Sequence, residues 1–431
     1  MTDLLSDAHA LALDAADPLS ALRSDFHVPK WNDPRHEGAE QAYFCGNSLG
    51  LQPKRARAMV EEVLDKWASE AVEGHFLQPA PWMPYHDMVR DGLADVVGAE
   101  PLEVVAMNSL TANLHFMMAS FYRPTRERPA ILMEAGAFPS DRYALESQLR
   151  FHGFNPATDL IELAPDAADG TFSMAAIERA IAEHGSRLAL VLWPGVQYRT
   201  GQAFDLAGIA RLAHGVGAVV GFDLAHGIGN IPVQLHDADA DFAVWCHYKY
   251  MNSGPGAVGG CFVHARHAHT DRPRLAGWWG HDQTSRFRMG PEFVPTPGAD
   301  GWQLSNPPIL ALAPLRASLD LFARAGGIGA LRARSLRLTG YLEALIHERL
   351  ATTLQIITPA EPERRGAQLS LRVAGGRDQG RALFEFLASQ GIVGDWREPD
   401  VIRISPAPLY NNHADILRFV RGVEAWRAGH A

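Results

Sequence analysis

The strongest constraint on the fold is an alternation of short apolar segments with helix-like segments through the middle of the chain. Residues 129–138 ("PAILMEAGAF"), 188–196 ("LALVLWPGV") and 218–229 ("AVVGFDLAHGIG") are apolar runs typical of buried strands. Between them, residues 174–185 and 205–217 have helical periodicity and end at glycine. Strands that alternate with helices usually pair in parallel and are covered by those helices. The sequence therefore predicts an α/β protein with a mostly parallel sheet.

The order of predicted helices and strands changes toward the C-terminus. A long helical stretch leads to the strand-like "AQLSLRV", the helix-like "GRALFEFLASQG" and a last strand, "VIRISP". No repeat or low-complexity linker separates this part from the rest, so we expect the lobes to share an interface. The predicted units are an N-terminal arm and helix (1–70), a large domain (71–312) and a smaller α+β domain (313–431).

Composition excludes several classes of protein. The 431 residues are enough for two packed lobes, and the net charge is 39 − 49 = −10 with both signs spread along the chain, which is no nucleic-acid footprint. No apolar run approaches the roughly 18 residues of a membrane span, and the N-terminus carries acids where a secretion signal needs bases. Cys45, Cys246 and Cys261 lack CxxC spacing, so we expect reduced thiols in a cytoplasmic protein that binds no membrane.

One lysine stands in an unusual setting. Lys249 lies in "DFAVWCHYKYMNSGPGAVGGCFV" (241–263), where a strand-like segment precedes it and a turn-rich "NSGPG" and a second strand-like segment follow. This places Lys249 at a strand end, where α/β enzymes carry their chemistry. The alternative is a surface lysine whose stem covers apolar neighbours.

An acid precedes this lysine at a second strand end. Asp223 stands 26 residues earlier, at the polar end of an apolar strand, and His226 follows it. A lysine that can form a Schiff base and a carboxylate that keeps a pyridine nitrogen protonated are the pair that pyridoxal phosphate requires. Taken singly, Asp223 could be a helix N-cap and His226 a hydrogen-bonded loop histidine.

Two further polar clusters suggest metal ions. "HDADAD" (236–241) resembles the start of a calcium loop, but Phe242 and Tyr248 stand where the turn glycine and the bidentate glutamate belong. "HARHAH" (264–269) has no ligand spacing typical of a metal site, so an exposed connector is the preferred interpretation. We predict no metal.

A series of motifs resembles the kynureninase family, pyridoxal-phosphate enzymes of the aspartate aminotransferase fold type (fold type I). The series covers most of the chain in order: "FCGNSLGLQPK" (44–54), "NSLTANLH" (108–115), "AFPSDRYALESQL" (137–149), "GFDLAHGIGN" (221–230), "CHYKYMNSGPG" (246–256), "GWWGH" (277–281), "SNPPIL" (305–310) and "IRISPAPLYN" (402–411).

The resemblance implies a set of cofactor contacts. It implies that Lys249 carries the cofactor, that Asp141 and Asp223 lie near the pyridine nitrogen, and that Phe138 stacks on the ring. It also implies contacts from Leu110, Thr111, Pro139, Ser140, His226 and Tyr248, and from Trp278 and Asn306 of a partner subunit in a homodimer with shared sites. Pro194 is a departure, because the family often has a hydroxyl residue there and proline offers neither a hydroxyl nor an N–H.

The resemblance also implies a reaction, the hydrolysis of L-kynurenine or its 3-hydroxy form to an anthranilate and L-alanine. Lys249 would move the α-proton and Tyr248 would donate a proton later, with Asp223 supporting the cofactor. Substrate contacts would come from Arg403 at the carboxylate and from His75, Ser305 and Asn306 at the aromatic ring. Three polar ring contacts predict a preference for 3-hydroxykynurenine, whose product points toward nicotinamide cofactor synthesis.

Two rival functions remain open at the level of sequence. A cysteine desulfurase or an aminotransferase of the same fold is the first, although a desulfurase needs a nucleophilic cysteine on a mobile loop. A cofactor-binding regulator is the second, although such a protein would be expected to add a DNA-binding module, and no helix-turn-helix signature or basic stretch is visible.

Overall fold

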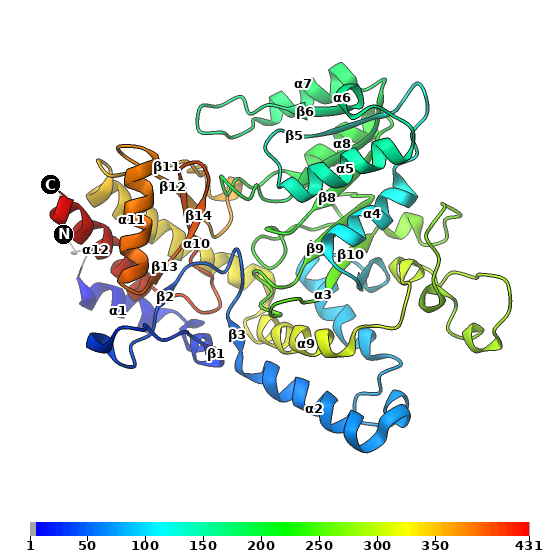
Figure 1. Ribbon diagram of the computed structural model, residues 1–431, viewed down its shortest axis with the longest axis horizontal. Helices are drawn as coiled ribbons and strands as arrows, with labels where there is room; N and C mark the ends of the chain where they lie inside the picture. Colours follow the sequence, from blue (N-terminus) through cyan, green and yellow to red (C-terminus); the bar gives the residue numbers. More distant parts are fainter. Residues whose placement is uncertain (1–5, 431) are drawn as a thin grey trace.

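A seven-stranded sheet forms the centre of the larger lobe (Figure 1). The computed structural model describes residues 6–430, so the first five residues of the N-terminal stretch considered above as a secretion signal lie outside it. The strand order is β4 (Val104–Ala106), β10 (Gly259–Val263), β9 (Phe242–Cys246), β8 (Val219–Asp223), β7 (Leu188–Pro194), β5 (Ala130–Glu134) and β6 (Leu160–Leu163). Strand β10 runs antiparallel to both its neighbours, and the others pair in parallel. The predicted α/β class is confirmed.

Helices cover both faces of this sheet because successive strand residues point to opposite sides. On β7, Leu190 and Leu192 join the core beneath one layer of helices, whereas Val191 and Trp193 join the core of the other. The first layer contains α4 (Leu110–Phe121) and α5 (Pro139–Phe151). The second contains α3 (Arg90–Val97), α7 (Met174–His184), α8 (Leu206–Gly215) and α9 (Ile309–Arg324), and the short α6 (Pro156–Asp159) precedes β6.

The smaller lobe is an antiparallel sheet with its own core. Its strand order is β11 (Leu354–Ile356), β12 (Leu369–Val373), β15 (Val401–Ile404) and β14 (Asp395–Arg397). The helices α10 (Gly327–Leu345), α11 (Arg377–Ser389) and α12 (His413–His430) pack on it. The core of the large lobe continues into α10 as far as Leu331, and the core of the smaller lobe takes over at Leu338 of the same helix.

The N-terminal segment touches both lobes. It contains α1 (Asp7–Ala16), β1 (Phe26–His27), β2 (Ala42–Tyr43), β3 (Gln52–Pro53) and α2 (Lys54–Glu70). Helix α1 packs on α12, β2 pairs in parallel with β13 (Ile392–Val393), and α2 packs along α9. Between β2 and β3, the Gly50 N–H donates to the carbonyl of Tyr248 at 2.8 Å, and a side chain at Gly50 would collide with the carbonyl of Lys249. This segment therefore covers the loop that carries the lysine.

Asp241 fixes the start of the strand that leads to Lys249. Its Oδ2 accepts from the Val220 N–H and lies 2.9 Å from His214 Nε2, while its Oδ1 lies 2.8 Å from both Arg266 Nη2 and His267 Nε2. Burial alone would raise the pKa of Asp241, but these hydrogen bonds hold it far below its usual range. The Asp241 carboxylate thus links β8, β9 and the segment after β10. These contacts, rather than a calcium ion, occupy both of its oxygens.

Between residues 6 and 430, no helix combines the length and the apolar character needed to cross a bilayer.

Candidate active site

A cavity of about 240 Å³ opens where β5, β7 and β8 end and where the loop after β9 crosses above them. The side chains that the sequence predicted for the cofactor converge here from separate parts of the chain. Those that line the cavity are Leu110, Thr111, Phe138, Ser140, Asp141, Asp223, His226, Tyr248 and Lys249. Pro139 does not line it, but occupies the first turn of α5 between Phe138 and Ser140.

Lys249 lies on the connection between β9 and β10, as the sequence predicted. Burial lowers the pKa of its ammonium group, although the Cys246 thiol and the carboxylates of Asp223 and Asp141 oppose this shift. A lysine with a lowered pKa has more of its amine in the neutral, nucleophilic form. Lys249 is therefore suited to bond covalently with an aldehyde.

Two carboxyl groups meet at the floor of the cavity. Asp223 ends β8 and accepts the Ala225 N–H at 2.6 Å, while Asp141 comes from the first turn of α5. Burial raises the pKa of both carboxyls, and the neighbouring Asp223 raises the pKa of Asp141 further through its charge and a hydrogen bond. The pair can hold a proton while keeping negative charge for a cationic ring nitrogen.

Another part of the cavity lining suits a phosphate. Helix α4 begins at Leu110, so its first N–H groups and its dipole face the cavity. The Thr111 and Ser140 hydroxyls lie 2.7 Å apart and link the starts of α4 and α5. Phe138 packs edge to face on Tyr198 with its ring centroid 5.5 Å away, which holds the aromatic ring predicted to stack on the cofactor.

The cavity walls fit pyridoxal phosphate by a second criterion, the polar atoms left unpaired. Five atoms of its lining are buried without a hydrogen-bond partner, namely Asn47 Oδ1, Glu134 Oε2, Asp141 Oδ1, His226 Nδ1 and Arg397 Nε. Burial and the charge of Lys249 lower the pKa of His226, so its imidazole is neutral and can accept or donate one bond. Unpaired buried polar groups are rare in folded proteins, and a polar ligand would satisfy these.

Arg403 lies behind the cavity wall rather than on its surface. It is fully buried on β15, where its Nη2 donates to Asp395 Oδ2 at 2.5 Å and its Nη1 to the carbonyl of Tyr198 at 2.8 Å. Arg397 lines the cavity instead, and its Nη2 donates to the same Asp395 oxygen at 3.1 Å.

Four other predicted residues do not line this cavity. Ser305 and Asn306 are exposed, Trp278 is 40 % exposed, and His75 is half-buried with its Nδ1 near the carbonyl of Val72. None of these four side chains therefore lines the cavity of its own chain, and the contribution of Trp278 and Asn306 from a second subunit stays a prediction.

Several lining residues were not predicted, although a signal existed for most of them. Asn47 and Ser48 lie within the "FCGNSLGLQPK" motif, and Glu134 is a polar residue at a strand end, like Asp223. Tyr198 and Arg397 carry no comparable local signal, because Tyr198 lies in the turn after β7 and Arg397 comes from β14 of the other lobe.

The thiols are poorly suited to desulfurase chemistry. Cys246 and Cys261 are buried on strands, and burial raises the pKa of both. Burial and the nearby Asp395 raise the pKa of Cys45 to about 12, and its Sγ donates to that carboxylate at 3.8 Å. A nucleophilic cysteine needs a lowered pKa, so none of the three meets this requirement.

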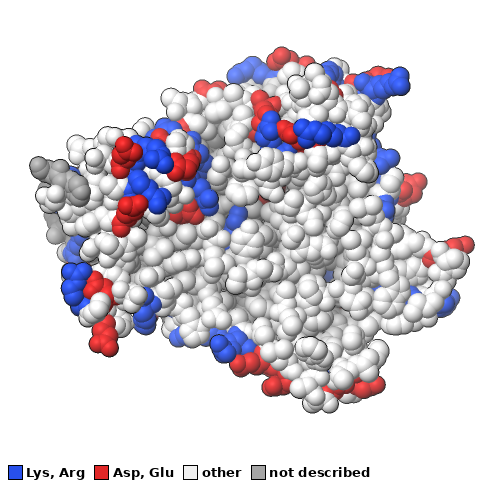
Figure 2. Space-filling model, in the orientation of Figure 1, with Lys and Arg blue, Asp and Glu red and all other residues white. Residues whose placement is uncertain are grey.

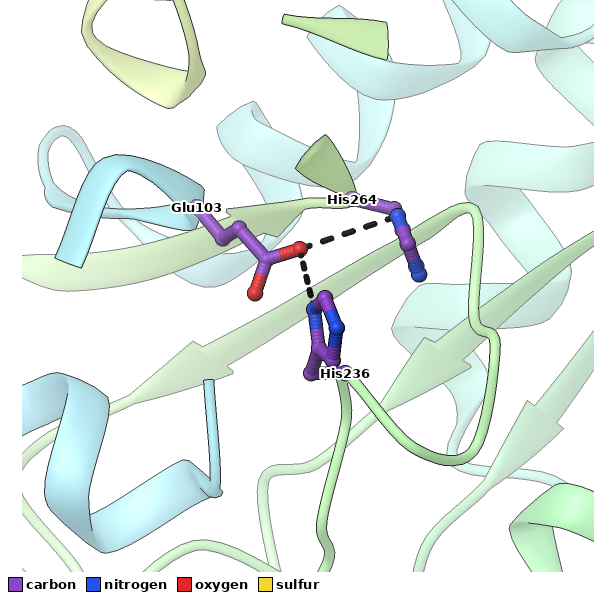
Figure 3. Close-up of side chains that lie close together, drawn as sticks. All are labelled: Glu103, His236 and His264. Atoms are coloured by element: carbon purple, nitrogen blue, oxygen red, sulfur yellow. Dashed lines mark hydrogen bonds and ion pairs between the residues drawn. The ribbon is translucent and has the colours of Figure 1, made fainter. Parts of the chain in front are cut away.

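Glu103, His236 and His264 form a cluster on the far end of the sheet (Figure 3). Glu103 Oε1 lies 2.9 Å from His236 Nδ1 and accepts the Ala265 N–H, and its Oε2 accepts the Glu100 N–H. His264 Nδ1 accepts the Arg266 N–H. The two imidazole rings are stacked 4.9 Å apart. Their in-plane nitrogen lone pairs therefore do not converge on one point, as those of two ligands to a shared metal ion would. Hydrogen bonding accounts for this cluster.

Comparisons with known proteins agree with the geometry. Residues 331–423 match the family described as "Kynureninase C-terminal domain". The chain is 70 % identical over 428 residues to a kynureninase of Xanthomonas campestris pv. campestris (strain B100), covering 99 % of this chain and all of that one. It is 68 % identical over the same length to a kynureninase of Xanthomonas axonopodis pv. citri, again covering 99 % and 100 %.

Solved structures share the fold at low identity. A cysteine desulfurase from Thermococcus onnurineus NA1 superimposes with a TM-score of 0.75 at 17 % identity, over 95 % of this chain and 98 % of that chain. A C-DES variant with glycine covalently linked to its PLP cofactor gives 0.74 at 18 % identity, over 93 % and 98 %. The fold is therefore that of the fold type I enzymes, and the chain belongs to the kynureninase family of pyridoxal-phosphate-dependent hydrolases.

Proposed function

We propose that this hydrolase acts in tryptophan degradation and prefers 3-hydroxy-L-kynurenine to L-kynurenine, releasing 3-hydroxyanthranilate and L-alanine. The observation that carries the proposal is the separation of two residue sets. One cavity holds most of the predicted cofactor residues. The polar side chains predicted for the substrate's aromatic ring lie outside it, with Ser305 and Asn306 exposed and His75 half-buried. A cytoplasmic location is part of the proposal, and three free thiols are consistent with it.

Two residues of the cavity, Lys249 and Tyr248, move protons in this reaction. The cofactor, when bound, draws electrons away from the substrate's α-carbon. The amine of Lys249 takes the α-proton. Water then adds to the γ-carbonyl, and the Cβ–Cγ bond breaks, which releases the aromatic acid and leaves the electron pair on the β-carbon. Burial raises the pKa of the Tyr248 phenol, so this group stays protonated and can supply the proton that completes L-alanine. Incubation with L-kynurenine should produce anthranilate fluorescence, and a lack of fluorescence and of alanine would reject the reaction.

The active form in this proposal is a homodimer in which each subunit completes its partner's site. Large apolar side chains are exposed near the predicted ring contacts, among them Trp67 (62 %), Phe76 (61 %) and Leu310 (46 %). A cleft of about 430 Å³ between α2 and the start of α9 is lined almost entirely by apolar residues. The face in Figure 2 shows few charged side chains over its middle. Such a surface is typical of a contact between subunits.

Mixing two inactive variants should restore activity if the sites are shared. We expect Lys249→Ala and Asn306→Leu to be inactive alone, because each removes a residue needed at every site. After subunit exchange, about one quarter of all sites should be intact, since half of the dimers are mixed and each has one unmutated site. Activity of the mixture checks this, with sedimentation as a measure of dimerisation.

The matched control for this experiment mixes Lys249→Ala with Asp223→Ala. Both residues line the same cavity of one chain, so every mixed dimer has two damaged sites and no activity should return. Recovery in the control, or no recovery with Asn306→Leu, would contradict the shared site.

The substrate preference predicts a second result. Wild-type kcat/KM should be about tenfold or more higher for 3-hydroxykynurenine, because polar groups built to bond a ring hydroxyl are left unpaired when it is missing. The double variant His75→Trp with Asn306→Thr makes the ring environment less polar and should lower this ratio. His269→Trp, on the exposed loop after β10, is the matched control. A wild type that prefers kynurenine, or an unchanged ratio in the double variant, would reject the preference while leaving the reaction intact.

A further inference from the structure

One carboxyl group of the cavity has no role in the reaction as described. Glu134 is the last residue of β5, its side chain is buried with 2 % exposure, and it lines the same cavity as Lys249. Its Oε2 is buried without a hydrogen-bond partner, and its Oε1 accepts only a long bond of 3.4 Å from Gln197 Nε2. Leaving a buried carboxyl oxygen unpaired is costly, so a bound group is expected to complete it.

Gln197 determines which oxygen of Glu134 is free. The Gln197 Oε1 accepts the N–H groups of Arg199 at 2.6 Å and Thr200 at 2.9 Å, which fixes the orientation of its amide. Its Nε2 must therefore point to the carbonyl of Gly136 and to Glu134 Oε1. Glu134 Oε1 is thus held as an acceptor, and Oε2 is the oxygen able to carry a proton toward the cavity.

The surroundings of Glu134 favour its neutral form. Asp223 on β8 and Asp141 on α5 are its carboxyl neighbours across the cavity, which Lys249, Arg397, Tyr248 and a neutral His226 also line. Burial raises the pKa of Glu134 to about 8, the charge of Asp223 adds to this, and the bond from Gln197 opposes it. Glu134 is therefore mostly protonated at neutral pH and can donate a hydrogen bond.

Another residue of the cavity lining cannot donate one. Pro194 ends β7, lines the same cavity and has neither an N–H nor a hydroxyl. We propose that Glu134, as a neutral carboxylic acid, donates a hydrogen bond to the phenolic oxygen of bound pyridoxal phosphate, in a cavity to which Pro194 contributes no donor. The proposal rests on the cofactor site and not on the choice of substrate.

Two substitutions separate a neutral donor from a charged group. Glu134→Gln keeps the shape and an N–H donor without a charge, so the dissociation constant of pyridoxal phosphate should change by less than about threefold. Glu134→Leu removes the donor and should weaken binding by about tenfold or more. Glu162→Gln, an exposed position on the neighbouring β6, is the matched control and should bind the cofactor like the wild type. Fluorescence titration of the cofactor-free enzyme measures all four constants.

Infrared spectroscopy provides a second readout that needs no cofactor and no turnover. The carbonyl-stretching band of a protonated carboxylic acid should appear in the wild type at neutral pH and lose intensity in Glu134→Gln. Equal weakening in the Gln and Leu variants, unchanged binding in Glu134→Leu, or no band difference would each overturn the proposal. A wild type that binds the cofactor normally but does not cleave kynurenine would reject only the proposed function.

Discussion

Replacement of Lys249 by alanine should lower kcat by at least about a thousandfold while leaving the fold intact. The side chain provides both the covalent attachment of the cofactor and the base that moves the α-proton, and no other lysine lines the cavity. The fold should survive because removal of a desolvated ammonium group relieves a cost rather than breaking a structural bond.

Borohydride reduction followed by peptide mapping gives a direct test of this role. The reduced cofactor should be found on the peptide that contains Lys249 and should be missing from the alanine variant. Lys30→Ala is the matched control. The Lys30 side chain is 60 % exposed, forms an ion pair with Glu40 and does not line the cavity. Label on another lysine, or turnover of the Lys249 variant close to that of the control, would refute the assignment.

Replacement of Arg403 by alanine should lower kcat/KM by roughly tenfold to a hundredfold, since a hydrogen bond to a charged group is worth about 1.5–3 kcal/mol. Arg403→Lys should not restore it, because an ammonium group cannot form two parallel bonds to a carboxylate. The buried position adds a structural cost, because Asp395 would keep only Arg397 and Cys45 as partners. Cofactor content and melting temperature should therefore be measured alongside the kinetics.

Arg397→Ala is the comparison that decides which arginine binds the substrate carboxylate. Both guanidinium groups bond Asp395 and both have a buried Nε without a hydrogen-bond partner, but only Arg397 lines the cavity. If Arg403 is the carboxylate clamp, KM should rise more in its variants than in Arg397→Ala. A larger loss in Arg397→Ala would transfer the role to that residue.

The sequence predicted the site residues that lie at the ends of strands. Apolar runs located β5, β7 and β8, and helical periodicity located α7 and α8. Parallel pairing brings the ends of such strands to one edge. Asp223 and Lys249 could be assigned for this reason, and Phe138 and Asp141 through their motif. The structure places all four on one cavity.

Other features depend on contacts between residues far apart in the sequence, which leave no pattern in the local sequence. The paired strands β2 and β13 have two residues each, too few for a periodicity to appear. The state of Glu134 depends on Gln197, 63 positions away, and the burial of Arg403 depends on Asp395 and on a carbonyl of the other lobe. The separation of His75, Ser305 and Asn306 from the cavity likewise emerges only when the chain is folded.

The pairing of β2 with β13 also has a consequence for synthesis on the ribosome. Ala42 pairs with Ile392, a separation of 392 − 42 = 350 positions. The N-terminal arm that this pair holds in place supplies Asn47 and Ser48 to the cavity, and its Gly50 binds the loop that carries Lys249. Closing so long a loop is entropically costly, and contacts of this range form slowly. Until translation has passed Ile392, the strand that holds the arm does not exist, so the cofactor finds its complete binding site only on a nearly full-length chain.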